Sequence, residues 1–106
     1  MAESLSLRTT GTNGTRVVFV GGELDMATAS ELEDFLADLD GHDLIVDIGG
    51  LSFIDSSGFS RLVAAHERLE RRGNRLTIRK ASPTATRAFA VLGLDQVLHL
   101  EADEVS

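Results

Sequence analysis

The stretch Leu51-Ser52-Phe53-Ile54-Asp55-Ser56-Ser57-Gly58 joins two segments with different hydrophobic periods, and it therefore decides the fold. Residues 44–48 before it form an apolar run that is typical of a buried strand. After it, apolar residues recur at helical spacing over 59–69 and indicate a helix. Ser56 and Ser57 thus stand at a helix N-terminus, where unpaired backbone N–H groups and the positive end of the helix dipole favour an added anion such as a phosphate.

Turn residues and hydrophobic periods divide the rest of the chain into alternating strands and helices. Residues 11–14 supply the glycine and asparagine of a hairpin loop, and Thr28 with Glu31 has the spacing of a capping box. The expected elements are strands over 4–10 and 16–20, a helix from Thr28 to near Gly41, a strand over 44–48, a helix over 57–72 ended by Gly73, a strand over 75–78, a helix from Ser82-Pro83 to Gly93, and an edge strand over 97–100.

This order of elements predicts one α/β domain over 1–106. We expect a mixed four- to five-stranded β-sheet with an N-terminal hairpin and three to four α-helices packed on it. The last helix is expected to direct four residues to the core, namely Ala85, Ala88, Phe89 and Leu92. The acidic tail over 101–106 is expected to fray.

The composition is that of an ordinary globular protein, with 42% hydrophobic and 25% charged residues. No apolar run approaches the roughly 20 residues of a membrane helix, and the first eight residues lack the pattern of a secretory signal. We therefore expect a cytoplasmic protein that does not associate with membranes. The chain has no cysteine and three scattered histidines, which argues against thiol chemistry, a structural zinc site of the usual kind and a catalytic zinc.

The net charge of −7 is unevenly distributed along the chain. Residues 17–60 hold ten acidic residues and no lysine or arginine, whereas eight of the ten basic residues lie between Arg61 and Arg87. Nucleic acid is not an expected partner, because its affinity comes largely from cations that neutralise phosphates. The charged runs are explained by solvated helix faces, and they leave a protein partner open.

A serine hydrolase is one function class to weigh, because Ser56 and Ser57 follow a strand. Such an enzyme needs a Gly-x-Ser-x-Gly elbow, a histidine base and an acid, and the elbow is missing. His66 is expected on the apolar side of its helix, His42 in a loop and His99 in the last strand. We therefore expect no catalytic residues and no enzymatic activity.

Two acidic residues, Glu23 and Asp25, follow the glycine pair 21–22. They could form a metal site or an acid–base pair, although such residues are common between a strand end and a helix cap. The glycine pair does not belong to a phosphate-binding loop. If the strand ending at Asp25 lies beside the one ending at Asp55, both turns open at the same edge and Asp25 lies near Ser57.

Taken alone, Asp-Ser-Ser-Gly is explained by helix capping, since aspartate and serine are preferred at helix starts. Together with Gly22-Glu23-Leu24-Asp25 and Thr28, however, the stretch 51–58 resembles the segments of bacterial anti-sigma factor antagonists, which are stand-alone STAS domains. The resemblance covers nearly the whole chain, and Leu92-Gly93-Leu94 is similar to the turn after the family's third helix. The tail after Glu101 is shorter than the last helix of many members.

The resemblance implies a STAS-like fold and a phosphorylation switch. Ser57 is the expected phosphoacceptor, with Ser56 as the alternative, and the kinase is an anti-sigma factor that the unphosphorylated chain binds. Binding releases a sigma factor for transcription, and a serine phosphatase resets the cycle. ATP and magnesium belong to the kinase, so the chain itself is expected to need no cofactor. The expected partner-binding residues are Glu23, Asp25, Thr28, Asp55, Ser56, Ser57, Gly58 and Arg61.

Some STAS domains, including transporter-associated ones, dock without a phosphorylation cycle. The resemblance therefore leaves open a non-switching docking module of a transporter ATPase or of a larger signalling complex.

Overall fold

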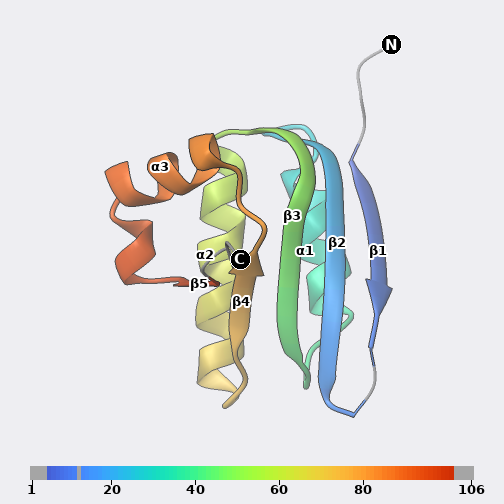
Figure 1. Cartoon of the computed structure of the whole chain (residues 1–106). Coiled ribbons are helices and arrows are strands. Elements are labelled where there is room, and N and C mark those ends of the chain that lie inside the picture. Colours follow the sequence, from blue (N-terminus) through green and yellow to red (C-terminus); the bar gives the residue numbers. More distant parts are fainter. Residues whose placement is uncertain (1–4, 12, 102–106) are drawn as a thin grey trace, which may run out of the picture.

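A five-stranded sheet in the order β1-β2-β3-β4-β5 forms the centre of the computed structural model, which describes residues 5–11 and 13–101 (Figure 1). β1 (Ser6–Thr10) pairs antiparallel with β2 (Thr15–Leu24). β3 (Asp43–Ile54), β4 (Leu76–Arg79) and β5 (His99–Leu100) continue the sheet in parallel with β2. The predicted mixed sheet with an N-terminal hairpin is confirmed. Ser4, Thr12 and the tail over 102–106 lie outside the described residues.

Three α-helices and one short 3₁₀ helix connect the parallel strands. They are α1 (Ala29–Ala37), α2 (Ser56–Arg71), α3 (Pro83–Val91) and η1 (Leu94–Gln96). Figure 1 shows α1 behind β2 and β3 and α2 behind β4, while α3 lies beyond the far edge of the sheet. None of the helices in the described part of the chain is long and apolar enough to cross a membrane.

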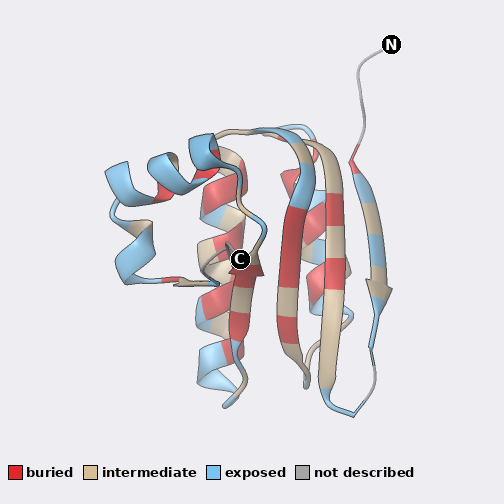
Figure 2. Cartoon of the chain, in the orientation of Figure 1, coloured by how far each residue is buried: buried red, intermediate tan, exposed pale blue. Residues whose placement is uncertain are grey.

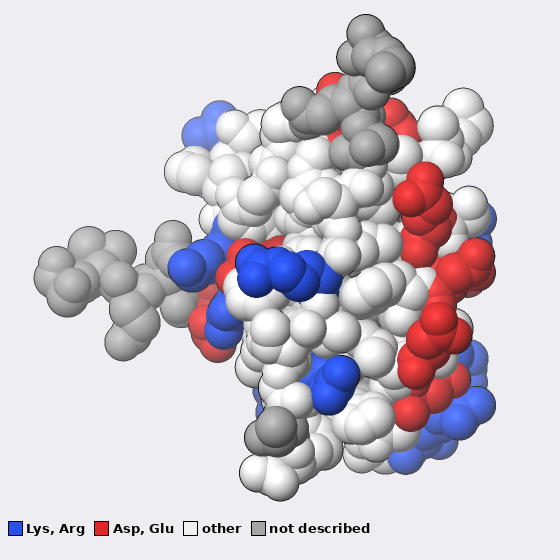
Figure 3. All heavy atoms as spheres, turned by 90° about the vertical axis from the view of Figure 1, so that its right-hand side faces the viewer, with Lys and Arg blue, Asp and Glu red and all other residues white. Residues whose placement is uncertain are grey.

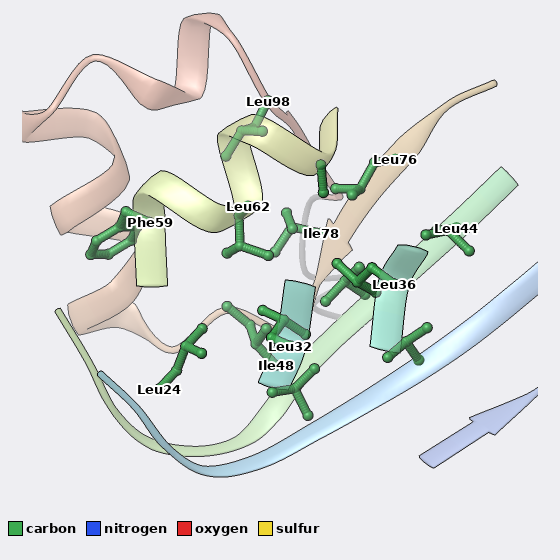
Figure 4. Close-up of a cluster of buried hydrophobic side chains, with 14 of the residues drawn as sticks. Leu24, Leu32, Leu36, Leu44, Ile48, Phe59, Leu62, Leu76, Ile78 and Leu98 are labelled. Atoms are coloured by element: carbon green, nitrogen blue, oxygen red, sulfur yellow. The ribbon is translucent and has the colours of Figure 1, made fainter. Parts of the chain in front are cut away.

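The core lies between the sheet and the helices (Figures 2 and 4). Alternate residues of each strand face this layer, because successive side chains of a strand point to opposite sides. The large fully buried residues are Val18, Val20 and Leu24 of β2, Leu44 and Val46 of β3, Leu76 and Ile78 of β4, Leu32 and Leu36 of α1, Leu62 and Leu69 of α2, and Phe89 of α3. The residues that recur at helical spacing over 59–69 therefore face the core, as predicted.

The prediction that Leu92 faces the core is wrong. Leu92 is 54% exposed, whereas Phe89 is fully buried and Ala85 is 8% exposed. The reason is that α3 buries only a narrow strip, formed by Ala85 and Phe89 four residues apart. Leu92 is the C-cap residue and lies outside this strip.

β3 is longer than the predicted strand over 44–48, since it continues through Gly49-Gly50 to Ile54. Gly50 lies where β3 passes close to β2, since a Cβ atom on it would lie 3.3 Å from the Cα atom of Gly21. A Cβ atom on Gly49 would instead lie 3.3 Å from the Cβ atom of Lys80, which follows β4. The pairing also shifts register between Phe19 and Gly21, and both strands curve here (Figure 1). Gly50 therefore marks close strand contact beyond the predicted end of the strand.

Candidate functional site

The ends of β2 and β3 meet at one edge of the sheet. Leu24 pairs with Ile54 in the parallel register, and the Asp55 N–H donates a hydrogen bond of 3.1 Å to the Leu24 carbonyl. The predicted adjacency of these strand ends is confirmed, and it places the turn after Leu24 beside the start of α2. We call the surface formed by Glu23, Asp25, Asp55, Ser56 and Ser57 the acidic edge.

Asp55 caps α2. Its carboxylate accepts hydrogen bonds from the Ser57 and Gly58 N–H groups at 2.9 and 3.3 Å. Ser56 is the first helical residue and is exposed, Ser57 is half-buried, and Gly58 is buried. Neither serine is therefore needed as the cap, and both hydroxyl groups stand in the first turn of a helix that is held by another side chain.

We expect Asp55→Ala to lower the free energy of unfolding by about 1 kcal/mol, because two N–H groups lose their acceptor. Urea denaturation followed by circular dichroism measures the difference. Asp55→Asn is the matched control, since asparagine caps helices about as well as aspartate. Equal losses in the two variants would mean that the carboxylate acts through its charge, and the capping account would be wrong.

Asp25 and Thr28 stabilise the turn between β2 and α1, which belongs to the acidic edge. The Asp25 carboxylate accepts from the Ala27 and Thr28 N–H groups at 2.9 and 3.1 Å. The Thr28 hydroxyl donates to the Glu23 carbonyl at 2.7 Å and accepts from the Asp25 N–H at 3.0 Å. Thr28 is only 8% exposed, so it shapes the turn from inside.

The capping box predicted for Thr28 and Glu31 is wrong. Thr28 is the N-cap residue of α1, but its side chain makes no capping hydrogen bond. Its hydroxyl is occupied by the backbone of Glu23 and Asp25, and it is therefore directed back into the turn. The Asp25 carboxylate takes over part of the capping role by accepting from the Thr28 N–H.

A shallow depression adjoins Ser57 between the start of α1 and the first turns of α2. It is lined by Met26, Ala29, Ser57, Ser60, Arg61 and Ala64. Met26 is 82% exposed, and Arg61 donates a 2.6 Å hydrogen bond to the Glu33 carboxylate, which joins the two helices. Met26 and Ser60 were not predicted from the sequence, because no periodic or capping signal singles them out.

Acidic side chains gather on the helix side of the molecule, in a column at the right of Figure 3. α1, which follows the acidic edge in the chain, carries the acidic residues Glu31, Glu33 and Asp34. The uneven charge along the sequence thus appears as an acidic region on the surface.

The arrangement does not support a serine nucleophile activated by His66. His66 is buried on α2, as predicted, but it lies nine residues after Ser57. At a rise of 1.5 Å per residue, this spacing separates the two residues by about 13 Å along the helix. The proton of Ser57 is therefore out of reach of this imidazole.

Comparisons with known proteins agree with the fold. The family model described as "Mlab, STAS domain" matches residues 7–100. The anti-sigma-B factor antagonist of Staphylococcus aureus (strain NCTC 8325 / PS 47) is 34% identical, over 96% of this chain and 98% of the relative. The crystal structure of an anti-sigma factor antagonist from Mycobacterium paratuberculosis matches with a TM-score of 0.83 and 27% identity, over 94% of this chain and 87% of that chain.

The fold also occurs inside a much larger protein. The murine Solute Carrier 26 family member A9 anion transporter matches 93% of this chain with a TM-score of 0.71, but the match covers only 20% of the transporter. At 19% identity, this likeness concerns the fold alone. The family model and the relative of equal length carry the assignment: the chain belongs to the STAS domain family of anti-sigma factor antagonists.

Proposed function

We propose that the unphosphorylated chain binds an anti-sigma factor that is also a serine kinase, and so releases a sigma factor in the cytoplasm. Phosphorylation of Ser57 by this partner ends the binding, and a serine phosphatase restores it. The observation that carries the proposal is the acidic edge, where Ser56 and Ser57 open the helix that Asp55 caps. The name of the Staphylococcus aureus relative supports an antagonist of this kind.

Asp55 determines where a phosphate on Ser57 can go. Free N–H groups were expected to receive the phosphate, but the Ser57 and Gly58 N–H groups already donate to the Asp55 carboxylate. A phosphate, with its charge of about −1.5 to −2, is therefore repelled by Asp55 and stays directed towards solvent. It adds its charge to the surface that the partner would cover.

This position explains how one modification could end binding without unfolding the domain. Burying a dianion next to Asp25 and Asp55 is costly unless the partner supplies matching cations. Each 1.4 kcal/mol of that cost lowers the affinity about tenfold. In the proposed interface Glu23, Asp25, Ser56 and Arg61 contact the partner, whereas the buried Thr28 and Gly58 hold the shape of the edge.

The proposal is tested with the wild-type chain, Ser57→Ala and Ser57→Asp as baits in a lysate of the source organism. We expect wild type and Ser57→Ala to retain a kinase-like anti-sigma factor. Ser57→Asp should bind it at least tenfold more weakly, because aspartate brings part of the phosphate's charge to the same place. Binding is then measured with the purified partner, and mass spectrometry locates the phosphate on the wild-type chain.

Two controls separate the switch from its alternatives. Thr86→Asp adds the same charge at an exposed position of α3, and its binding should equal that of wild type. Ser56→Ala should still be phosphorylated. If the wild-type chain carries phosphate on Ser56 and none on Ser57, the phosphoacceptor is Ser56. If all baits retain one partner and no phosphate forms, the chain is a non-switching docking module. A domain of the same fold is part of the transporter named above.

A further inference from the structure

Three metal-binding side chains come together at the end of the domain opposite to the acidic edge. His66 and Glu70 lie one turn apart on α2, and His99 lies on β5. Their donor atoms are all within 4.8 Å of one another. The Glu70 carboxylate lies between the two imidazoles, 3.8 Å from Nε2 of His66 and 3.8 Å from Nε2 of His99.

The fold creates this cluster from residues that are scattered in the sequence. β5 pairs with β4 in the register Thr77 to His99, and α2 packs against β4. The two imidazole rings consequently stand 5.5 Å apart, at 70° to each other. The three histidines are scattered in the sequence, and the pairing of β5 with β4 brings two of them together.

His66 is the unusual member of the cluster. The residue is 5% exposed, and its Nδ1 atom is buried without a hydrogen-bond partner among the described residues. Its Nε2 atom, at 3.8 Å from Glu70, is beyond hydrogen-bond distance. Nδ1 is thus buried without a partner among the described residues, whereas the other ring nitrogen, Nε2, faces the Glu70 carboxylate and is the atom open to a ligand.

We propose that His66, Glu70 and His99 bind a Zn²⁺ ion through two imidazole nitrogens and one carboxylate oxygen. Two imidazoles and a carboxylate are a known zinc donor set, with a water molecule as the fourth ligand. Tetrahedral ligands at the usual zinc distances lie about 3.3 Å apart, whereas the donor atoms here, one per residue, lie within 4.8 Å of one another. The two 3.8 Å separations run to different oxygens of Glu70, so the donor atoms must approach one another by up to about 1.5 Å. The side chains of Glu70 and His99 are 55% and 38% exposed and can make this adjustment.

The ion would join β5 to α2. β5 has only two residues and is an edge strand, so a ligand shared with α2 would fix the end of the domain in place. The role assigned to the ion is therefore structural, and it is independent of the acidic edge.

Arg75 competes with the metal for His99. Its Nη2 atom lies 3.2 Å from Nδ1 of His99. A guanidinium group only donates, so this contact requires an unprotonated Nδ1 and leaves the proton on Nε2. Zinc on Nε2 requires the opposite tautomer, and the exposed Arg75 must then turn away.

The site is tested on the full chain without an affinity tag, because a histidine tag would itself bind metal. Isothermal titration with ZnCl₂ should give one ion per wild-type chain, and the melting temperature should rise with zinc and fall back with EDTA. Glu70→Gln and His99→Asn should weaken binding at least tenfold. Arg75→Gln should bind more tightly, because a glutamine oxygen can accept the proton of Nδ1.

Two variants control for unspecific binding. Glu67→Gln changes an exposed carboxylate one turn before Glu70, and His42→Asn removes the histidine that lies outside the cluster. Both should bind zinc as the wild type does. Absence of saturable binding in the wild type, or equal affinity of Glu70→Gln and Glu67→Gln, would overturn the proposal.

Discussion

Gly58→Ala is expected to lower the free energy of unfolding by about 2 kcal/mol, although alanine is normally the better helix residue. A Cβ atom at this position would lie 2.7 Å from Cγ of Leu24 and 2.9 Å from Cγ1 of Ile54, closer than real Cβ atoms approach. The propensity gain is about 1 kcal/mol, whereas overpacking costs about 1–3 kcal/mol and more where nothing can yield. Leu24 is fully buried, so the cost prevails.

Chemical denaturation of the wild type, Gly58→Ala and the variants below measures this effect. Ser60→Ala is the matched control, because Ser60 is an exposed α2 residue and should change stability by less than about 0.5 kcal/mol. In a Leu24→Ala background, two of the three close contacts disappear and only that with Cγ1 of Ile54 remains, so the penalty of Gly58→Ala should fall. If Gly58→Ala is as stable as wild type, the first turn of α2 does not pack this tightly on the strand ends.

Arg79→Met is expected to destabilise the domain by about 2–3 kcal/mol, since it leaves a buried carboxylate without its cation. The Asp47 side chain is 7% exposed, and its Oδ2 accepts a 2.9 Å hydrogen bond from Nε of Arg79 on the neighbouring strand. Breaking a buried ion pair costs about 3–5 kcal/mol. The loss expected here is smaller, because the Arg79 side chain is 26% exposed and water can partly replace it.

A double-mutant cycle tests this explanation. Asp47→Asn removes the charge but can still accept from the Gly49 N–H, which now donates to Asp47 at 2.9 Å. The double variant Asp47→Asn with Arg79→Met should therefore regain most of the stability lost in Arg79→Met alone. Simple addition of the two single losses would show that Arg79 acts through packing, for example on the ring of Phe19, 5.7 Å away.

The elements that the sequence predicted well are those specified by local chemistry. Apolar periods gave the order of strands and helices, and Ser82 caps α3 as expected, with its hydroxyl accepting from the Ala85 N–H at 3.1 Å. Gly73 ends α2 with a φ of 79°, in the left-handed region that favours glycine. Such signals depend on neighbours in the chain and can be recognised without knowing the fold.

The features that the sequence did not predict depend on residues far apart in the chain. The β3 strand was expected over the apolar run 44–48, and the pairing with β2, which Gly50 approaches closely, carries it on to Ile54. The pairing of Arg61 with Glu33 requires α1 and α2 to be packed together. The two serines, Asp25 and Asp55 were found from the motif, whereas the depression beside them has no sequence signal.

The order of strands in the sheet repeats their order in the chain. Each parallel strand joins the edge left by the strand before it, so every pairing closes a loop of one connection only, and the entropic cost of closure stays low. The hairpin of β1 and β2 needs no later residue to form, and it then offers an edge to β3. The domain can therefore assemble in the direction of its own synthesis, with each emerging strand meeting its partner already in place.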